Sequence, residues 1–306
     1  MLSKIVLVVP LVLAAACSAK APSQSEMQVP VPAPAAAASP SLNPCLKPVA
    51  DKKARAKAKR DLTDDLASYA RSRPGRVTAY AVDLESGASV GYHQNSHDQI
   101  TASGAKIEIL VTLLRQARAD HRGLSGSERS LATDMITQSD NKAADALYGR
   151  IGGGSGVAST YRKLHMNDTD PGPSIYWGGT TTSPADRVKL VTALAEDGHG
   201  LHADDRGYAL GLMRKVVKDQ KWGVSAAARP GDEVALKNGW TPRPFVHDTW
   251  AVTSTGLVTG PGRTYALSIL TDVQPGEGSG ITTIEHISDM VEKRMPALSA
   301  TVEKPC

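Results

Sequence analysis

Aromatic side chains are scarce in this chain, where they make up 4% of the 306 residues and include a single phenylalanine. A core must therefore be built from Leu, Val, Ile and Ala, which the 41% hydrophobic content allows. Basic and aromatic residues spread together over a fold are typical of nucleic-acid binding, and the chain has no such pattern. Much of its net charge of +4 lies in one run, residues 51–60. That run indicates a solvated helix face, with attraction to an anionic membrane as the less favoured interpretation. Because basic and aromatic residues are not spread together over the chain, we expect no nucleic-acid partner.

Metal-binding patterns are missing as well. His93 and His97 have the four-residue spacing of some zinc ligands, but they fall in a predicted strand and loop, and the sequence contains no H-E-x-x-H pattern. We therefore expect neither a metal nor a cofactor.

The only apolar run near the N-terminus, residues 5–13, is too short to span a bilayer. It follows one lysine and precedes small residues and Cys17, which predicts an export signal over residues 1–17. The small residues before Cys17 resemble the processing site of bacterial lipoproteins, although Leu13 lies one position farther from the cysteine than that pattern prefers. We expect a lipid-anchored protein outside the cytoplasm, acylated at Cys17, with a plain secreted protein as the alternative.

Residues 18–44 are rich in Ala, Pro, Ser and Val, which predicts a disordered tether that leads to a folded domain over residues 45–306. Apart from Cys17, the only cysteines are Cys45 at the start of that domain and Cys306 at the end of the chain. In an oxidising compartment these two form a natural pair. The alternative is two free thiols.

The order of the predicted elements indicates an α/β fold of the α+β sandwich kind. A helix over residues 51–72 is followed by two strands, several helices, three strands and a last helix. This order predicts a five-stranded antiparallel sheet that is flanked by the terminal helices. An all-helical subdomain, at about residues 101–225, is expected between strands 2 and 3. Trp177 and Trp222, each followed by glycine, are interpreted as packing anchors of loops, with a place in a binding groove as the alternative.

A serine and a lysine stand three residues apart in the stretch TASGAKIEIL, at Ser103 and Lys106. On a helix this spacing places both side chains on one face. Serine is a poor nucleophile unless a base takes its proton, and lysine is a poor base unless burial or a second cation lowers its pKa. The apolar run that follows Lys106 provides such burial, but this pattern alone occurs often by chance.

Two further stretches carry polar residues of interest. Ser139, Asp140 and Asn141 stand directly before a predicted helix, where they could bind a substrate or cap the helix. Lys237, Asn238 and Gly239 lie inside a predicted strand, where the glycine would allow a ligand to approach the backbone. An ordinary lysine on an exposed edge strand is the other interpretation.

Taken in this order, S-x-x-K, S-D-N and K-x-G resemble the motif set of the serine β-lactamases of class A and the penicillin-binding proteins. The resemblance extends over about residues 51–300 and is strongest to the β-lactamase-related serine hydrolase lipoproteins of actinobacteria. This resemblance implies the β-lactamase/transpeptidase fold. It also implies that the protein is a serine hydrolase that acts on β-lactams or peptidoglycan-like peptides.

The resemblance also implies a role for each motif residue. Ser103 would be the acylated nucleophile, Lys106 the base, and Ser139 the group that passes a proton to the leaving nitrogen. Asn141 would orient the substrate amide. Lys237 would attract the substrate carboxylate and keep Lys106 neutral.

The third motif would complete the substrate site. Asn238 stands where the family has Thr or Ser, and it could donate to the substrate carboxylate with a different reach. The backbone N–H groups of Ser103 and Trp240 would form the oxyanion hole.

One family residue has no counterpart. Class A β-lactamases carry a glutamate in the loop after the S-D-N helix, which activates the deacylating water, but residues 142–195 contain no glutamate. Asp168 and Asp170 lie in this region without a matching motif and are interpreted as turn residues beside Pro171. We therefore expect acylation with slow release. The alternatives are a β-lactamase with another deacylation base and a non-catalytic binding or sensing lipoprotein.

The implied topology also bears on the cysteines. The first and last strands of the sheet would be antiparallel neighbours, so the helices that precede and follow them would bring both chain ends together. A disulfide between Cys45 and Cys306 would then close nearly the whole domain, stabilising it by about 4–5 kcal/mol in the chain-entropy model. We expect a monomer.

Overall fold

The computed structural model describes residues 46–299 and 301–305, which belong to one compact unit of residues 45–306. The predicted signal, the tether and all three cysteines, Cys17, Cys45 and Cys306, lie outside the described residues. Within the described part, no helix is long and apolar enough to cross a membrane. The same part contains no cluster of three or more His, Cys, Asp or Glu residues that could hold a metal ion.

A five-stranded antiparallel sheet with the strand order β3-β2-β8-β7-β6 forms the centre of the molecule, which confirms the predicted fold class. Successive strands alternate in direction because short connections join β2 to β3, β6 to β7 and β7 to β8. The strands are β2 (Arg76–Asp83), β3 (Ser89–Tyr92), β6 (Glu233–Arg243), β7 (Thr249–Gly260) and β8 (Arg263–Gln274).

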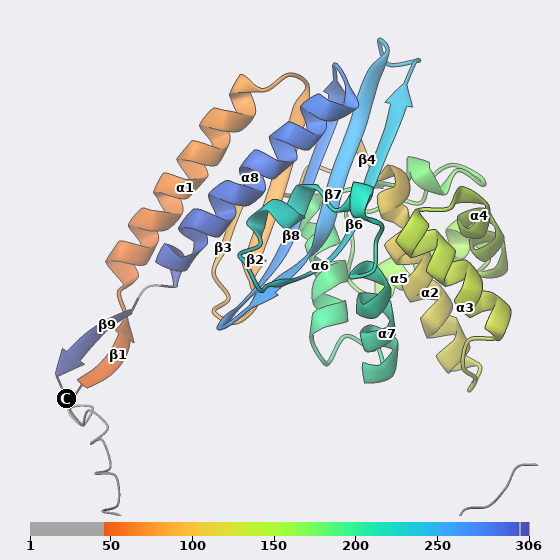
Figure 1. Cartoon of the computed structure of the whole chain (residues 1–306), viewed down its shortest axis with the longest axis horizontal. Helices are drawn as coiled ribbons and strands as arrows, with labels where there is room; N and C mark the ends of the chain where they lie inside the picture. Colours follow the sequence, from red (N-terminus) through yellow and green to blue (C-terminus); the bar gives the residue numbers. More distant parts are fainter. Residues whose placement is uncertain (1–45, 300, 306) are drawn as a thin grey trace, which may run out of the picture. The chain divides into compact units, whose positions relative to one another are not determined.

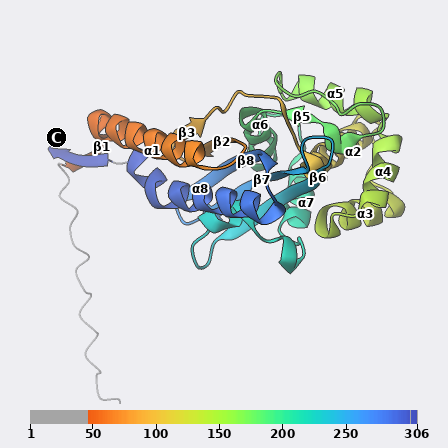
Figure 2. The same ribbon diagram turned by 90° about the horizontal axis from the view of Figure 1, so that it is seen from above.

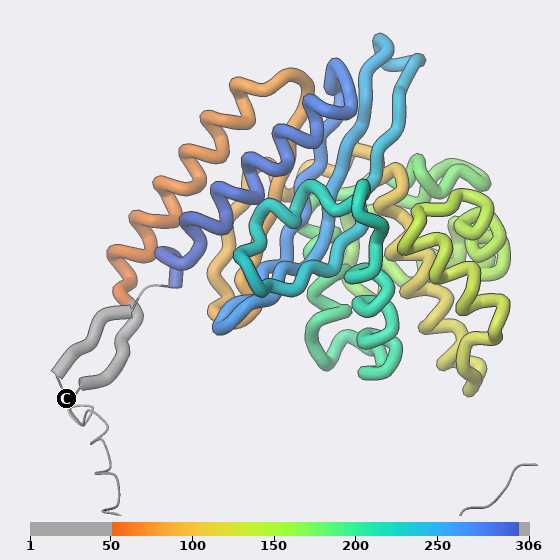
Figure 3. Tube along the Cα trace, in the orientation of Figure 1, coloured from red at the N-terminus to blue at the C-terminus, as the bar shows by residue number. Residues whose placement is uncertain are grey.

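The two terminal helices, α1 (Lys52–Ser72) and α8 (Glu277–Leu298), cover one face of this sheet, as Figures 1 and 2 show. Leu62 and Leu66 of α1 are buried with apolar residues of α8, β2 and β8. The two helices run antiparallel along each other (Figure 3). Tyr69, near the end of α1, stacks on His286 in the middle of α8, while Arg55, near the start of α1, donates to the carbonyl of Leu298 at the end of α8. This face therefore has its own core.

The other face of the sheet carries the inserted helices. A second core unites α2 and α4–α7 with residues such as Ala235 and Leu257 of the sheet. Most of these helices match the predicted ones; they are α2 (Lys106–Ala119), α3 (Gly126–Thr133), α4 (Asn141–Arg150), α5 (Gly153–Lys163), α6 (Pro184–Ala195) and α7 (Ala203–Met213). Figure 1 shows α2–α5 gathered on the side of β6 that lies away from α1.

The insertion is not purely helical, so that expectation was wrong. Two short strands, β4 (Gln99–Ile100) and β5 (Thr181–Thr182), pair across it. The pair joins the segment just before Ser103 to the segment before α6, two parts of the chain that are far apart in sequence. Strands of two residues give no period that a sequence pattern could reveal.

A second two-stranded ribbon joins the ends of the domain. Strand β1 (Leu46–Ala50) pairs antiparallel with β9 (Thr301–Pro305), and Leu46 stands opposite Pro305. These two residues are the chain neighbours of Cys45 and Cys306. The ribbon supports the prediction that the two ends of the domain meet, and the disulfide itself remains a prediction.

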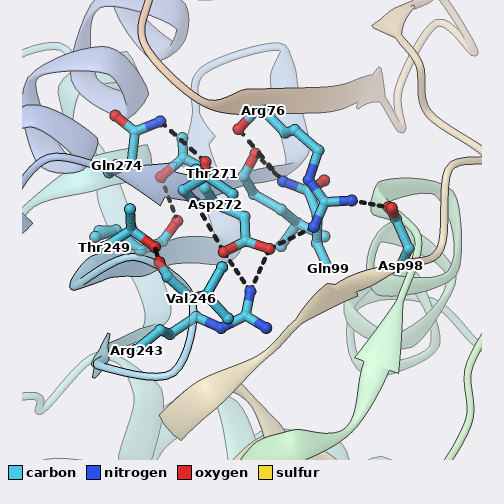
Figure 4. Close-up of polar contacts among 12 residues, drawn as sticks. Arg76, Asp98, Gln99, Arg243, Val246, Thr249, Thr271, Asp272 and Gln274 are labelled. Carbon is cyan, nitrogen blue, oxygen red and sulfur yellow. Dashed lines mark hydrogen bonds and ion pairs between the residues drawn. The ribbon is translucent and has the colours of Figure 1, made fainter.

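A buried carboxylate fixes the outer end of β6. The side chain of Asp272 is fully buried, and it accepts hydrogen bonds from Arg243 at 2.5 Å and from Arg76 at 2.6 Å. Arg76 in turn pairs with Asp98 (Figure 4). Because these groups lie on β8, β6 and β2, the network holds the motif-bearing strand β6 to the centre of the sheet.

Candidate active site

Ser103 lies in a tight 3-10 turn, Ala102–Ala105, directly before α2. The turn begins at Ala102 with a φ of 47°, a left-handed conformation that costs free energy for a residue with a Cβ. The backbone N–H of Thr101 bonds the carbonyl of Thr180 at 2.9 Å, which ties the turn to the loop before α6. Ser103 itself is half-buried, so its hydroxyl stays accessible.

Lys106 is fully buried, and its ammonium group joins the first two motifs. Its Nζ lies 3.0 Å from Ser103 Oγ, 3.0 Å from Ser139 Oγ and 2.7 Å from Asn141 Oδ1. Burial lowers the pKa of Lys106 to about 8, against the opposing fields of Asp140 and Asp145. A substantial fraction of this lysine is therefore neutral near physiological pH, in direct contact with the serine hydroxyl.

The S-D-N segment leaves its serine and asparagine free to meet Lys106. A π-helical turn over Asp134–Gln138 ends at Ser139, whose φ is 58°. Asp140 caps α4, because its side chain accepts the N–H of Ala143 at 2.7 Å. Of the three residues, Asp140 caps the helix, which was the alternative interpretation of the whole segment. Ser139 and Asn141 instead contact Lys106.

Lys237 is also fully buried, on β6, and its one hydrogen bond in the described part of the chain goes to the carbonyl of Asn238 at 2.9 Å. Burial, and then the charge of Lys106, hold the pKa of Lys237 well below its usual range. Lys106 has several acceptors for its ammonium group, whereas Lys237 has one among the described residues. The charge of Lys106 thus lowers the pKa of Lys237, and the expected effect of Lys237 on Lys106 stays a prediction.

Asn238 is the predicted residue that the structure does not bring into this cluster. Its amide donates to the carbonyls of Gln220 at 2.9 Å and Trp222 at 3.0 Å, and its Oδ1 accepts from Ser254 at 2.6 Å. Both N–H groups are thus engaged away from the cluster. Asn238 links β6 to the segment before it and to β7, and it has no donor left for a substrate carboxylate.

Gly239 permits a close approach to β6, but the group that approaches is the chain's own backbone and not a ligand. A Cβ at this position would lie 2.3 Å from the carbonyl oxygen of Thr101 and 2.9 Å from the backbone N of Ser103. The strand therefore packs directly on the nucleophile turn, which places the backbone of Ser103 beside β6. The half-buried ring of Trp240, the next residue, packs edge-on against Trp222 with 5.9 Å between ring centroids.

Trp177 is a site residue whose importance was not apparent from the sequence. Its ring lies over Lys106, with the Nζ 4.8 Å from the ring centroid. Its indole N–H donates to Asp145 at 2.7 Å. The sequence favoured a loop anchor, with a place in a binding groove as the alternative, and the folded chain places the ring on the lysine.

A buried ion pair beneath the nucleophile turn was likewise not predicted. Glu108 and Arg187 are almost fully buried and pair with each other, and Arg187 donates to the carbonyl of Gly104 at 2.9 Å. The glutamate inside the apolar run IEILV was the available signal. Because a buried charge that loses its partner is costly, this pair holds the turn in place.

The loop before α6 contributes no carboxylate to Lys106 or Ser103 among the contacts of the described residues. Asp170 forms two backbone hydrogen bonds with Thr181, at 3.0 and 3.1 Å. The backbone N–H of Asp168 donates to Asp186 at 2.7 Å. Both residues help to shape the loop.

Comparisons with known proteins bear on the family and the fold of the chain. The model of the family described as "Beta-lactamase enzyme family" matches residues 126–295, more than half of the chain. The Mycobacterium tuberculosis (strain ATCC 25618 / H37Rv) protein named "Putative lipoprotein LppW" is 25% identical over 226 residues, which are 71% of this chain and 68% of that protein.

Two solved structures show the same fold. A class A beta-lactamase from Mycobacterium abscessus has a TM-score of 0.66 at 21% identity and covers 77% of this chain and 99% of its own. A mutant of PBP-A, solved as an acyl-enzyme complex with penicillin G, has a TM-score of 0.67 at 21% identity and covers 78% of this chain and 97% of its own. The family match begins after Ser103 and Lys106, so the roles of these two residues depend on their geometry.

Proposed function

The chain belongs to the beta-lactamase enzyme family, and from this premise we propose that it is a serine hydrolase that becomes acylated at Ser103. The observation that carries the proposal is the position of Lys106 Nζ, which contacts Ser103 Oγ, Ser139 Oγ and Asn141 Oδ1 at 2.7–3.0 Å. A buried amine with a pKa of about 8 is a competent base at neutral pH.

In the proposed reaction, neutral Lys106 takes the proton of Ser103 while the Oγ attacks the carbonyl carbon of the substrate amide. The backbone N–H groups of Ser103 and Trp240 stabilise the oxyanion, since β6 packs directly on the nucleophile turn. Ser139 passes the proton to the leaving nitrogen, and the bond between the carbonyl carbon and that nitrogen breaks. Asn141 orients the amide group.

Lys237 is proposed to bind the substrate carboxylate. It is fully buried without a carboxylate partner in the described part of the chain, and its pKa is held well below the usual range. An incoming anion supplies the missing counter-charge, so Lys237 gains a proton as substrate binds. Asn238 is left out of this role because both of its N–H groups are engaged elsewhere.

We propose β-lactams and peptidoglycan-like peptides as the substrate class. The PBP-A mutant solved as an acyl-enzyme with penicillin G supports this choice. Release of the acyl group should be slow, because no carboxylate contacts Lys106 or Ser103 among the described residues.

Intact mass spectrometry over time tests the proposal. The purified protein is incubated with penicillin G, beside Ser103→Ala, which lacks only the hydroxyl. We expect a stable adduct of penicillin mass that is absent in the variant. An adduct that disappears while the drug is consumed would instead identify a working β-lactamase with another deacylation base. No adduct at all would refute the acylation proposal and favour a non-catalytic binding lipoprotein.

We further propose that residues 1–17 are a lipoprotein signal, that residues 18–44 tether a monomeric domain, and that Cys17 is lipidated at the cell envelope. The name of the mycobacterial relative supports this proposal. Metabolic labelling with a palmitate analogue tests it directly. Label should enter the wild-type protein and be absent from Cys17→Ser, and equal labelling of both would contradict the anchor.

A further inference from the structure

We propose that Trp177 keeps water away from Lys106, so that the acyl group at Ser103 is retained once transferred. This inference rests on the proposed function. Ser103, Ser139 and Asn141 provide the polar contacts of the Lys106 Nζ. The indole ring of Trp177 lies over the same atom, 4.8 Å from its centroid. The side of the lysine that faces the loop is thus covered by an apolar surface.

The ring is held in place by its loop. Its N–H donates to Asp145 of α4 at 2.7 Å. The next residue, Gly178, packs on the nucleophile turn, since a Cβ there would lie 3.8 Å from the Cα of Ala102. Earlier in the loop, a Cβ on Gly172 would lie 1.9 Å from the carbonyl oxygen of Tyr176. The loop is therefore tightly folded, and the neighbours of Trp177 keep it over Lys106.

This position matters for the second half of the reaction. Hydrolysis of the acyl-enzyme requires a water oxygen to bond to the ester carbonyl carbon while the water gives a proton to neutral Lys106. The bond between that carbon and Ser103 Oγ then breaks, and the proton passes from Lys106 to Oγ. Lys106 is the only titratable side chain that contacts Ser103 Oγ in the described part of the chain. A cover over Lys106 therefore blocks the available route for water.

The cover also affects the first half of the reaction. Burial is the largest cause of the lowered pKa of Lys106, and the Trp177 ring contributes to that burial. Removing the ring readmits water to the ammonium and moves the pKa of Lys106 toward its usual value. Acylation then requires a higher pH. A residue whose only role was structural packing would leave the pH profile of acylation unchanged.

The experiment compares wild type with Trp177→Ala and Trp177→Phe. Each protein is acylated with penicillin G and freed of drug, and the loss of the adduct is followed by intact mass at pH 9.5, where Lys106 of the wild type is largely neutral. We expect Trp177→Ala to lose the adduct about tenfold faster or more, with its acylation profile shifted to higher pH. Trp177→Phe keeps a ring over the lysine and should be intermediate.

A matched pair at Asp145 tests the tether of the ring. Asp145→Asn keeps an acceptor for the indole N–H and should retain the adduct as wild type does. Asp145→Ala releases the ring and should approach Trp177→Ala. Equal adduct lifetimes in wild type, Asp145→Ala and both Trp177 variants, with cooperative melting, would overturn this inference alone. If wild type forms no adduct at Ser103, the proposed function is refuted, and this inference, which rests on it, is refuted as well.

Discussion

The rate of acylation should follow the charge of Lys106 as pH changes. With a pKa of about 8, roughly a tenth of this lysine is neutral at pH 7. A solvent-exposed lysine, with the ordinary pKa of 10.5, would be neutral in about 0.03% of molecules, so burial raises the available base about 300-fold at pH 7. Acylation should therefore rise about tenfold from pH 7 to a plateau above pH 9, half-complete near pH 8.

The assay measures the second-order rate of labelling by a fluorescent penicillin from pH 5.5 to 9.5, quenched before release. Lys106→Gln keeps a hydrogen-bonding side chain, one bond shorter and without a base, and should remove the pH-dependent part of the rate. A wild-type profile that is flat over this range, or that still rises steeply at pH 9.5 without a plateau, would refute the reasoning. The first result would exclude Lys106 as the base, and the second would exclude its desolvation.

The same pKa gives the sign of a stability effect. In the folded state Lys106 holds its proton less tightly than in the unfolded state, so between about pH 8 and 10.5 the unfolded chain binds more protons. The contribution of Lys106 to the free energy of unfolding thus becomes more favourable as pH rises through this window. Below it, the full cost is on the order of 3 kcal/mol. Urea unfolding of wild type and Lys106→Met at several pH values should show this difference in slope, and parallel curves would contradict it.

Three further predictions concern the surroundings of the site. Gly239→Ala should abolish acylation, because the new Cβ would lie 2.3 Å from the carbonyl oxygen of Thr101. Gly104→Ala is the control and should retain most activity, because its Cβ would lie 3.4 Å from the nearest atom. Equal acylation rates in the two variants would contradict the packing argument. Thiol titration of the denatured, unreduced protein should find Cys45 and Cys306 unreactive, and full reactivity of both would refute the predicted disulfide. Calorimetry of penicillin binding to a non-acylating variant, in buffers of different ionisation enthalpy, should show uptake of up to about one proton that is lost in Lys237→Gln, and the same uptake in both proteins would assign the proton elsewhere.

The sheet and most of the helices were predictable because each carries a long periodic pattern. The strands β2, β6, β7 and β8 and the helices α1, α2 and α8 lie where the sequence indicated. Helix α5 was missed because GGSGVASTYRK begins with residues of low helix propensity, and the burial of Val157 and Tyr161 stabilises it instead. The ribbon β1–β9 and the pair β4–β5 were missed because short strands depend on partners far away in the chain.

The candidate site shows the same division. Ser103, Lys106, Ser139, Asn141 and Lys237 could be singled out from their residue types and spacing, since the first motif lies within one helical turn. Which other residues surround them depended on contacts between distant segments.

The sequence alone determined the order of the elements, the three motifs and the absence of a glutamate in the loop before α6, because these are properties of neighbouring residues. Tertiary structure alone decided that burial lowers the pKa of Lys237, that Asn238 turns away from the cluster, and that the Trp177 ring lies over Lys106. Burial and hydrogen-bond partners set these outcomes, and both are supplied by parts of the chain that only folding brings together.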